Sequence, residues 1–156
     1  ATLIHGKCIA AAGWWDSITF VPSTRRDAPP HLQAAAGLAK MVAWNNSASH
    51  RFTLEGGPNF QGSPRTIFAD RFVVPERYAD RVRGKHVLVV DDTWTSGAKM
   101  QSAAVALKDV GARRVTALCV TRWTRWDWPD HEAVLRTLDT PYDPLHCPIH
   151  GGFCEP

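Results

Sequence analysis

Residues 87–97 have the sequence Val-Leu-Val-Val-Asp-Asp-Thr-Trp-Thr-Ser-Gly, the strongest structural signal in the chain. Its four aliphatic residues end a run over residues 85–90 that is typical of a β-strand buried on both faces. Beyond the Thr-Ser-Gly turn, apolar side chains recur at helical spacing until Gly111, which is a typical helix stop. The stretch therefore predicts a strand, a turn and a helix.

The segments on either side of this stretch complete an α/β domain. Residues 115–120 predict the next buried strand, and strand, helix and strand in this order form a βαβ unit with parallel strands. Weaker patterns predict strands at residues 17–21, 51–55 and 72–74 and helices at residues 31–44 and 132–138. We therefore expect a Rossmann-like parallel sheet flanked by helices.

Length and composition fit one such domain. The chain has 156 residues, of which 44% are hydrophobic, so we expect a single domain over residues 1–156 with its core at about 17–122 and a tail at 123–156. No run approaches the roughly 18 apolar residues of a membrane helix, and the first residues lack an export-signal pattern, so we expect a cytoplasmic protein. The formal net charge of +3 suits an anionic ligand but is too small and scattered for a nucleic-acid surface.

The turn after the central strand predicts a phosphate site. Ligands bind at the carboxyl ends of parallel strands, and the start of the following helix offers unpaired amides at its positive dipole end. Gly97 permits close backbone approach, while the hydroxyls of Thr95 and Ser96 donate further hydrogen bonds. Asp91 and Asp92 then lie where they accept hydrogen bonds from sugar hydroxyls. A phosphate site beside acceptors for hydroxyls predicts a ribose 5-phosphate ligand. The alternative is that Asp91 and Asp92 only cap a helix in a doubly wound fold that binds no such ligand, although a cap requires one acid rather than two.

This string resembles the phosphoribosyl-diphosphate (PRPP) motif of type I phosphoribosyltransferases, which has four apolar residues, two acids, two spacers and Thr-Thr/Ser-Gly. The resemblance implies the type I phosphoribosyltransferase fold, with Asp91 and Asp92 as catalytic residues on the ribose hydroxyls. It also implies Mg²⁺ on the diphosphate and a 5-phosphate held by Thr95, Ser96, Gly97 and Ala98. Lys99 stands where the family usually has Thr, and it either adds charge to the phosphate site or marks a drifted site.

Residues 18–26, Ile-Thr-Phe-Val-Pro-Ser-Thr-Arg-Arg, resemble the first strand and pyrophosphate loop of the same family. The Val-Pro followed by basic residues is closest to the ComF-like, amidophosphoribosyltransferase-related branch. By this resemblance Ser23, Thr24 and Arg25 bind the diphosphate, with Arg26 as a further cation. A solvated basic loop is the alternative.

The Gly- and Pro-rich residues 56–65 correspond to the flexible loop that closes over PRPP in this family. Arg51 or Arg65 would then reach the diphosphate, although an ordinary exposed loop remains an alternative. With this loop, the resemblance extends over residues 17–122.

The tail has its own chemistry. Residues 146–154, His-Cys-Pro-Ile-His-Gly-Gly-Phe-Cys, offer thiolates and imidazoles, the usual ligands of zinc. Cys147, His150 and Cys154 are therefore candidate zinc ligands, with Cys8 as a further one. The spacing of Cys147 and Cys154 is wider than a two-residue knuckle, so a disulfide or unbound thiols remain alternatives. The nearby tryptophans, Trp123, Trp126 and Trp128, either stack on a nucleobase or pack the tail onto the core.

Together these patterns predict a pentosyltransferase, an enzyme that transfers the phosphoribosyl group of PRPP to a nitrogen acceptor that the sequence does not identify. A PRPP- or nucleotide-sensing regulatory or competence-related protein without transfer activity is one alternative, favoured by Lys99 and by the short region before Ser17. An enzyme that hydrolyses a ribose phosphate is another. The expected partners are PRPP and this acceptor, without nucleic acid or membrane, and a homodimer is left open.

Overall fold

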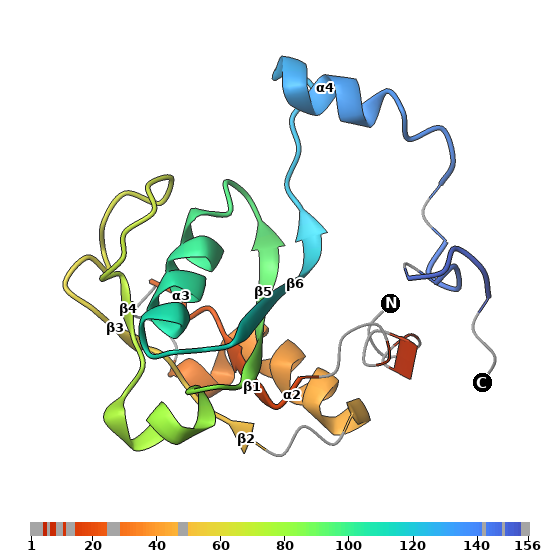
Figure 1. Cartoon of the computed structure of the whole chain (residues 1–156). Coiled ribbons are helices and arrows are strands. Elements are labelled where there is room, and N and C mark those ends of the chain that lie inside the picture. The colour runs from red at the N-terminus through yellow and green to blue at the C-terminus, as the bar shows by residue number, and fades with distance from the viewer. Residues whose placement is uncertain are drawn as a thin grey trace.

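A four-stranded parallel sheet forms the centre of the computed structural model, which describes residues 5, 7–8, 11, 15–24, 29–46, 50–141, 143–147 and 149–153. The strand order is β2-β1-β5-β6, and every neighbouring pair is parallel (Figure 1). The strands are β1 (Ser17–Phe20), β2 (His50–Arg51), β5 (His86–Trp94) and β6 (Arg114–Arg122). This sheet with helices on its faces is the predicted α/β fold class, which is confirmed.

Helices cover both faces of the sheet because β5 alternates two apolar sets of side chains. Val87 and Val89 pack with α3 (Ala98–Asp109) in one core, whereas Leu88 and Val90 pack with α2 (Ala34–Asn46) in the other. These four side chains of β5 are at most 1% exposed. The 3-10 helix η1 (Pro30–Leu32) leads into α2, and η2 (Glu76–Arg81) leads towards β5.

A small antiparallel ribbon lies on the α3 side of the sheet. It pairs β3 (Glu55–Gly56) with β4 (Phe72–Val73), and the loop between them covers residues 57–71. The buried Arg71 donates hydrogen bonds from Nη2 to the carbonyls of Ser63 (2.5 Å) and Thr66 (3.1 Å). The guanidinium therefore fixes the far end of this loop against its base.

The tail leaves the sheet after β6. Its helix α4 (Pro129–Leu135) contains no buried residue, and the chain then returns to the amino-terminal segment (Figure 1). There the carbonyl oxygen of Pro144 lies 2.9 Å from His5 Nε2. Of the helices in the described ranges, none combines the length and the apolar character that crossing a membrane requires.

Several predicted boundaries need correction. Residues 51–55 do not form one strand, because Arg51 ends β2 in the main sheet and Glu55 begins β3 in the ribbon. The strand predicted to stop at Val90 continues to Trp94, since its pairing with β6 extends to Trp94 and Arg122. The predicted burial of residues 115–120 is wrong: β6 is the edge of the described sheet, and its side chains are half-buried or exposed.

Two glycines give opposite expectations for the same substitution. Gly37 lies exposed in α2, where an added Cβ meets no atom within 4 Å, so Gly37→Ala should stabilise the protein by about 0.5–1 kcal/mol. Gly111 follows α3 with a φ of +99°, and its added Cβ would meet only Arg83 Cγ, at 3.5 Å. Gly111→Ala should therefore cost about 1–2 kcal/mol through backbone strain alone. Urea unfolding of the two variants checks this, and equal shifts would contradict the assigned backbone conformations.

Candidate functional site

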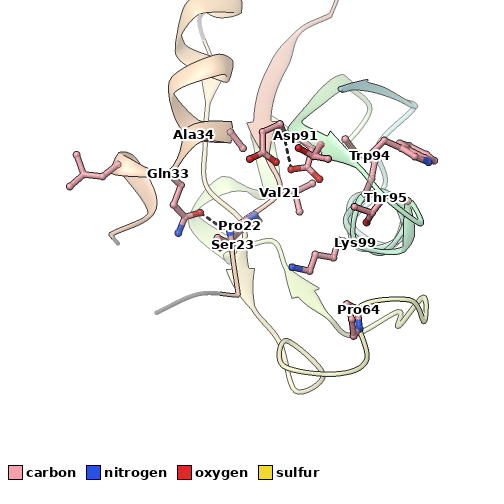
Figure 2. A pocket seen from close by; sticks show the side chains of 16 residues that line it. Val21, Pro22, Ser23, Gln33, Ala34, Pro64, Asp91, Trp94, Thr95 and Lys99 are labelled. Carbon is pink, nitrogen blue, oxygen red and sulfur yellow. Dashed lines mark hydrogen bonds between the residues drawn. The ribbon is translucent and has the colours of Figure 1, made fainter. Parts of the chain in front are cut away.

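A cavity of about 630 Å³ opens where β1 and β5 end at the same edge of the sheet. Figure 2 shows its walls, with Asp91 and the turn after β5 on one side and the segment after β1 on the other. The two walls lie at the same edge of the sheet because β1 and β5 pair in parallel, which aligns the carboxyl ends of the strands. The residues that line it are Val21, Pro22, Ser23, Leu32, Gln33, Ala34, Ala35, Pro64, Asp91, Asp92, Thr93, Trp94, Thr95, Gly97, Lys99 and Met100.

The two acids at the end of β5 have different surroundings. Asp91 is half-buried, whereas Asp92 is exposed. Burial raises the pKa of Asp91 to about 7, and the negative charge of Asp92 adds to this effect, while Lys99 acts in the opposite direction. Asp91 Oδ1 accepts a hydrogen bond of 3.0 Å from the backbone amide of Asp92. A bound cation or hydroxyl donors would therefore stabilise the charged form of Asp91.

Cys119 lies opposite Asp91 in the neighbouring strand β6. Burial raises the pKa of its thiol to about 11, and the charges of Asp91 and Asp92 add to the rise. The thiol is therefore protonated at neutral pH, which disfavours a role as a nucleophile.

The turn from β5 into α3 depends on glycine. Gly97 has a φ of +75°, and a Cβ at this position would lie 2.3 Å from Cζ2 of Trp94. The indole therefore supports the turn, leaving Thr95 and Gly97 at the cavity wall. The first amides of a helix have no acceptor within the helix, so this end of α3 suits an anion.

Two hydrogen bonds hold the wall that is formed by the segment after β1. The backbone amide of Ser23 donates to Gln33 Oε1 at 2.7 Å, which ties the segment after β1 to the start of α2. Across the cavity, Lys99 Nζ donates to Thr24 Oγ1 at 3.1 Å. In Figure 2 the Lys99 side chain extends from α3 towards Ser23. One cation therefore connects the two predicted phosphate-binding segments.

The loop over residues 57–71 reaches both walls. Pro64 lines the cavity, and its carbonyl oxygen accepts a hydrogen bond of 3.3 Å from Ser96 Oγ. Gln61 Nε2 donates to the carbonyl of Thr24 at 3.2 Å. The loop therefore lies beside the cavity, where the predicted lid would have to be.

The structure brings most of the predicted site residues together. Ser23, Asp91, Asp92, Thr95, Gly97 and Lys99 line the cavity. Ser96 and Ala98 belong to the same turn and helix start, and Thr24 lines an adjoining cavity. Arg25 and Arg26 lie outside the described residues.

Three further placements differ from the expectations. Arg51 lines a separate cavity beside β1, and the Arg65 guanidinium lies 5.3 Å from the centre of the Trp128 ring. Neither arginine lines the cavity at the end of β5. Gln33 was not predicted, because a glutamine before a helix resembles any polar residue until its contact with Ser23 is known.

The candidate metal ligands of the two chain ends also converge. The ligand atoms of Cys8, Cys147 and His150 all lie within 4.8 Å of one another, and Cys154 lies outside the described residues. None of these three residues lines the cavity at the end of β5.

Comparison with known proteins supports the fold. No family model matches the sequence, and no curated protein matches it. The crystal structure of a purine phosphoribosyltransferase from Pyrococcus horikoshii Ot3 aligns with a TM-score of 0.51 and 13% identity, covering 78% of this chain and 69% of that one. A phosphoribosyltransferase from Corynebacterium diphtheriae aligns with a TM-score of 0.46 and 20% identity, covering 86% and 69%. The first alignment shows that the chain shares the fold of that phosphoribosyltransferase structure, and at this identity it concerns the fold alone.

The raised pKa of Asp91 has a consequence for stability. The carboxyl binds its proton more tightly in the folded state than in the unfolded one, so folding stability falls as pH rises from about 4 to about 7. Asp91→Asn removes this loss. We expect its stability relative to the wild type to increase by on the order of 1–2 kcal/mol between pH 5 and pH 8.

Urea unfolding at the two pH values measures this difference. Asp109→Asn replaces an exposed carboxyl at the other end of α3 and serves as the matched control. A relative stability of Asp91→Asn that does not change with pH would show that the burial of Asp91 is not as described.

Proposed function

We propose that the cavity at the end of β5 binds PRPP with Mg²⁺ and that the protein transfers the phosphoribosyl group to a nitrogen acceptor. The observation that supports this best is the convergence of two carboxylates, a glycine turn at a helix start and one lysine on a single cavity. Acids beside a phosphate site match a ligand that carries both hydroxyls and phosphates. The cavity volume is within the usual range for small-molecule sites.

In this proposal each wall of the cavity binds a different part of the ligand. Asp91 and Asp92 accept hydrogen bonds from the ribose hydroxyls, and residues 95–98 hold the 5-phosphate. Ser23 and Thr24 bind the diphosphate, with Arg25 and Arg26 as predicted contributors. The resemblance of residues 18–26 to the ComF-like branch is part of this assignment.

Lys99 then has a defined role. Its ammonium donates a hydrogen bond to Thr24 in the segment after β1, and its positive charge acts to lower the pKa of Asp91. We infer that it supplies positive charge between the two phosphate-binding segments, which the usual Thr of the motif does not.

The residues of the cavity fit Mg²⁺. This ion takes oxygen ligands and is commonly bound through one or two carboxylates together with substrate phosphates. Asp91 and Asp92 provide the carboxylates, and Ser23 and Thr95 line the same cavity. When bound with PRPP, the ion would neutralise charge that develops on the departing diphosphate.

The residues of the chain contribute position and charge. The acids hold the ribose so that its anomeric carbon is accessible, and Lys99 stabilises negative charge on the leaving group. The bond between this carbon and the diphosphate oxygen breaks, and the lone pair of the acceptor nitrogen forms the new bond. The loop over residues 57–71 would exclude water that otherwise competes with the acceptor.

A binding protein without transfer activity is the second candidate, and Lys99 is the observation that favours it. A lysine bonded across the cavity to Thr24 would hold PRPP firmly and retard release of diphosphate. Product analysis after incubation with PRPP, Mg²⁺ and a set of nitrogen bases distinguishes the cases. A phosphoribosylated base together with diphosphate indicates transfer, and ribose 5-phosphate together with diphosphate indicates hydrolysis. Unchanged PRPP with measurable binding indicates a sensor.

Calorimetric titration of PRPP with Mg²⁺ tests the binding site directly. The wild type should bind, and Asp91→Asn/Asp92→Asn should bind at least about tenfold more weakly, a loss of about 1.4 kcal/mol or more, because the ribose hydroxyls lose charged acceptors. The double variant removes two charges, so the control must do the same.

Asp80→Asn/Asp109→Asn is this control, since both carboxyls are exposed and neither lines the cavity. It should bind as the wild type does. A folded wild type that binds no PRPP at millimolar concentration would refute the proposal, and so would equal affinity in all three proteins.

A further inference from the structure

The cluster that joins the two ends of the chain is separate from the cavity and has the geometry of a metal site. Cys8 Sγ lies 3.8 Å from His150 Nε2, and the ligand atoms of Cys8, Cys147 and His150 are all within 4.8 Å of one another. Tetrahedral zinc, with bonds of about 2.3 Å to sulfur and about 2.0 Å to nitrogen, separates its ligand atoms by roughly 3.5–3.8 Å. The three side chains are therefore already close to the arrangement that this ion needs.

The backbone around Cys147 forms a tight turn that presents two of these ligands together. The amide of Gly151 donates to the carbonyl of Cys147 at 2.9 Å, and the amide of Cys147 donates to the carbonyl of Gly152 at 2.8 Å. Gly151 has a φ of +71°, a conformation that favours glycine. Cys147 and His150 are separated by two residues, the spacing of a zinc knuckle.

The third ligand comes from the other end of the chain. Cys8 lies in a helical turn near the amino terminus, and the contact between His5 and the carbonyl of Pro144 brings the same two segments together. His5 is fully buried and Cys147 is 2% exposed. Figure 1 shows that, after α4, the carboxyl-terminal segment runs back towards the amino-terminal segment.

The apolar side chains of the tail do not explain why its end is held in place. Leu138, Leu145, Ile149 and Phe153 are exposed by 66%, 52%, 49% and 69%, and α4 contains no buried residue. A segment without a core of its own usually needs a covalent or metal cross-link. Buried Cys147 in this setting is explained by a cross-link at the cluster.

We propose that Cys8, Cys147 and His150 are ligands of a structural zinc ion that joins the two ends of the chain. Thiolate and imidazole ligands favour zinc over the hard cations that carboxylates select. A structural site has four protein ligands, and Cys154 is the fourth candidate from the sequence. This ion is distinct from the Mg²⁺ at the cavity, and the two proposals do not depend on each other.

The test begins with metal analysis of reduced protein purified without chelators. Elemental mass spectrometry should find about one zinc ion per chain. Cys147→Ser and His150→Gln should each weaken zinc binding at least roughly tenfold in competition with a chromogenic chelator, because each loses a ligand.

The chain offers matched controls for both substitutions. Cys119→Ser replaces the half-buried cysteine of β6, and His146→Gln replaces an imidazole that packs on Phe153 with ring centres 5.4 Å apart. Both should retain zinc. Cobalt substitution of the wild type, which requires no variant to fold, should give the visible spectrum of a tetrahedral site with thiolate ligands, and Cys8→Ser should reduce its thiolate contribution.

Limited trypsin digestion measures the structural role. Removal of the metal should increase cleavage after Arg136 in the tail. Three results would each overturn the proposal: a reduced wild type that binds neither Zn²⁺ nor Co²⁺, full zinc affinity in Cys147→Ser and His150→Gln, or a disulfide between Cys8 and Cys147 in the purified protein. Cleavage unchanged by metal removal would contradict the structural role.

Discussion

The pairing of β5 with β1 on one side and β6 on the other is the constraint on which the site depends. β5 is central in the sheet, and its apolar residues serve two cores at once, so its position cannot shift without exposing one of them. The backbone positions of Asp91 and Asp92 are fixed in the same way because both residues belong to this strand. The parallel register with β1 then brings Ser23 to the same edge of the sheet, and the cavity forms between the two strand ends.

The charges at this edge of the sheet offset one another only in part. Burial raises the pKa of Asp91 and the neighbouring carboxylate adds to the rise, while Lys99, which lines the same cavity, offsets part of this effect. Such an arrangement costs stability when the site is empty and favours ligands that bring a cation and hydroxyl donors. Lys99 also reaches Thr24, so the charge that opposes the acids connects the two walls.

The sequence was sufficient for the parts of the fold that local patterns determine. The aliphatic run before Asp91 and the helix ending at Gly111 were predicted because burial on both faces and a left-handed residue leave clear local signals. The burial of β6 was mispredicted because edge and central strands can share an apolar pattern. The role of Gln33 and the meeting of Cys8 with His150 depend on contacts between distant segments, which one sequence does not encode locally.

The proposed site holds a phosphorylated ribose ligand between the segment after β1 and the turn after β5. Hydrogen exchange of backbone amides, measured in the presence of Mg²⁺ with and without PRPP, tests whether both segments contact this ligand. Residues 95–99 and residues 23–24 should be protected together, and exchange in α4 should not change with PRPP. Protection confined to other segments, or none at saturating PRPP, would contradict the proposed site.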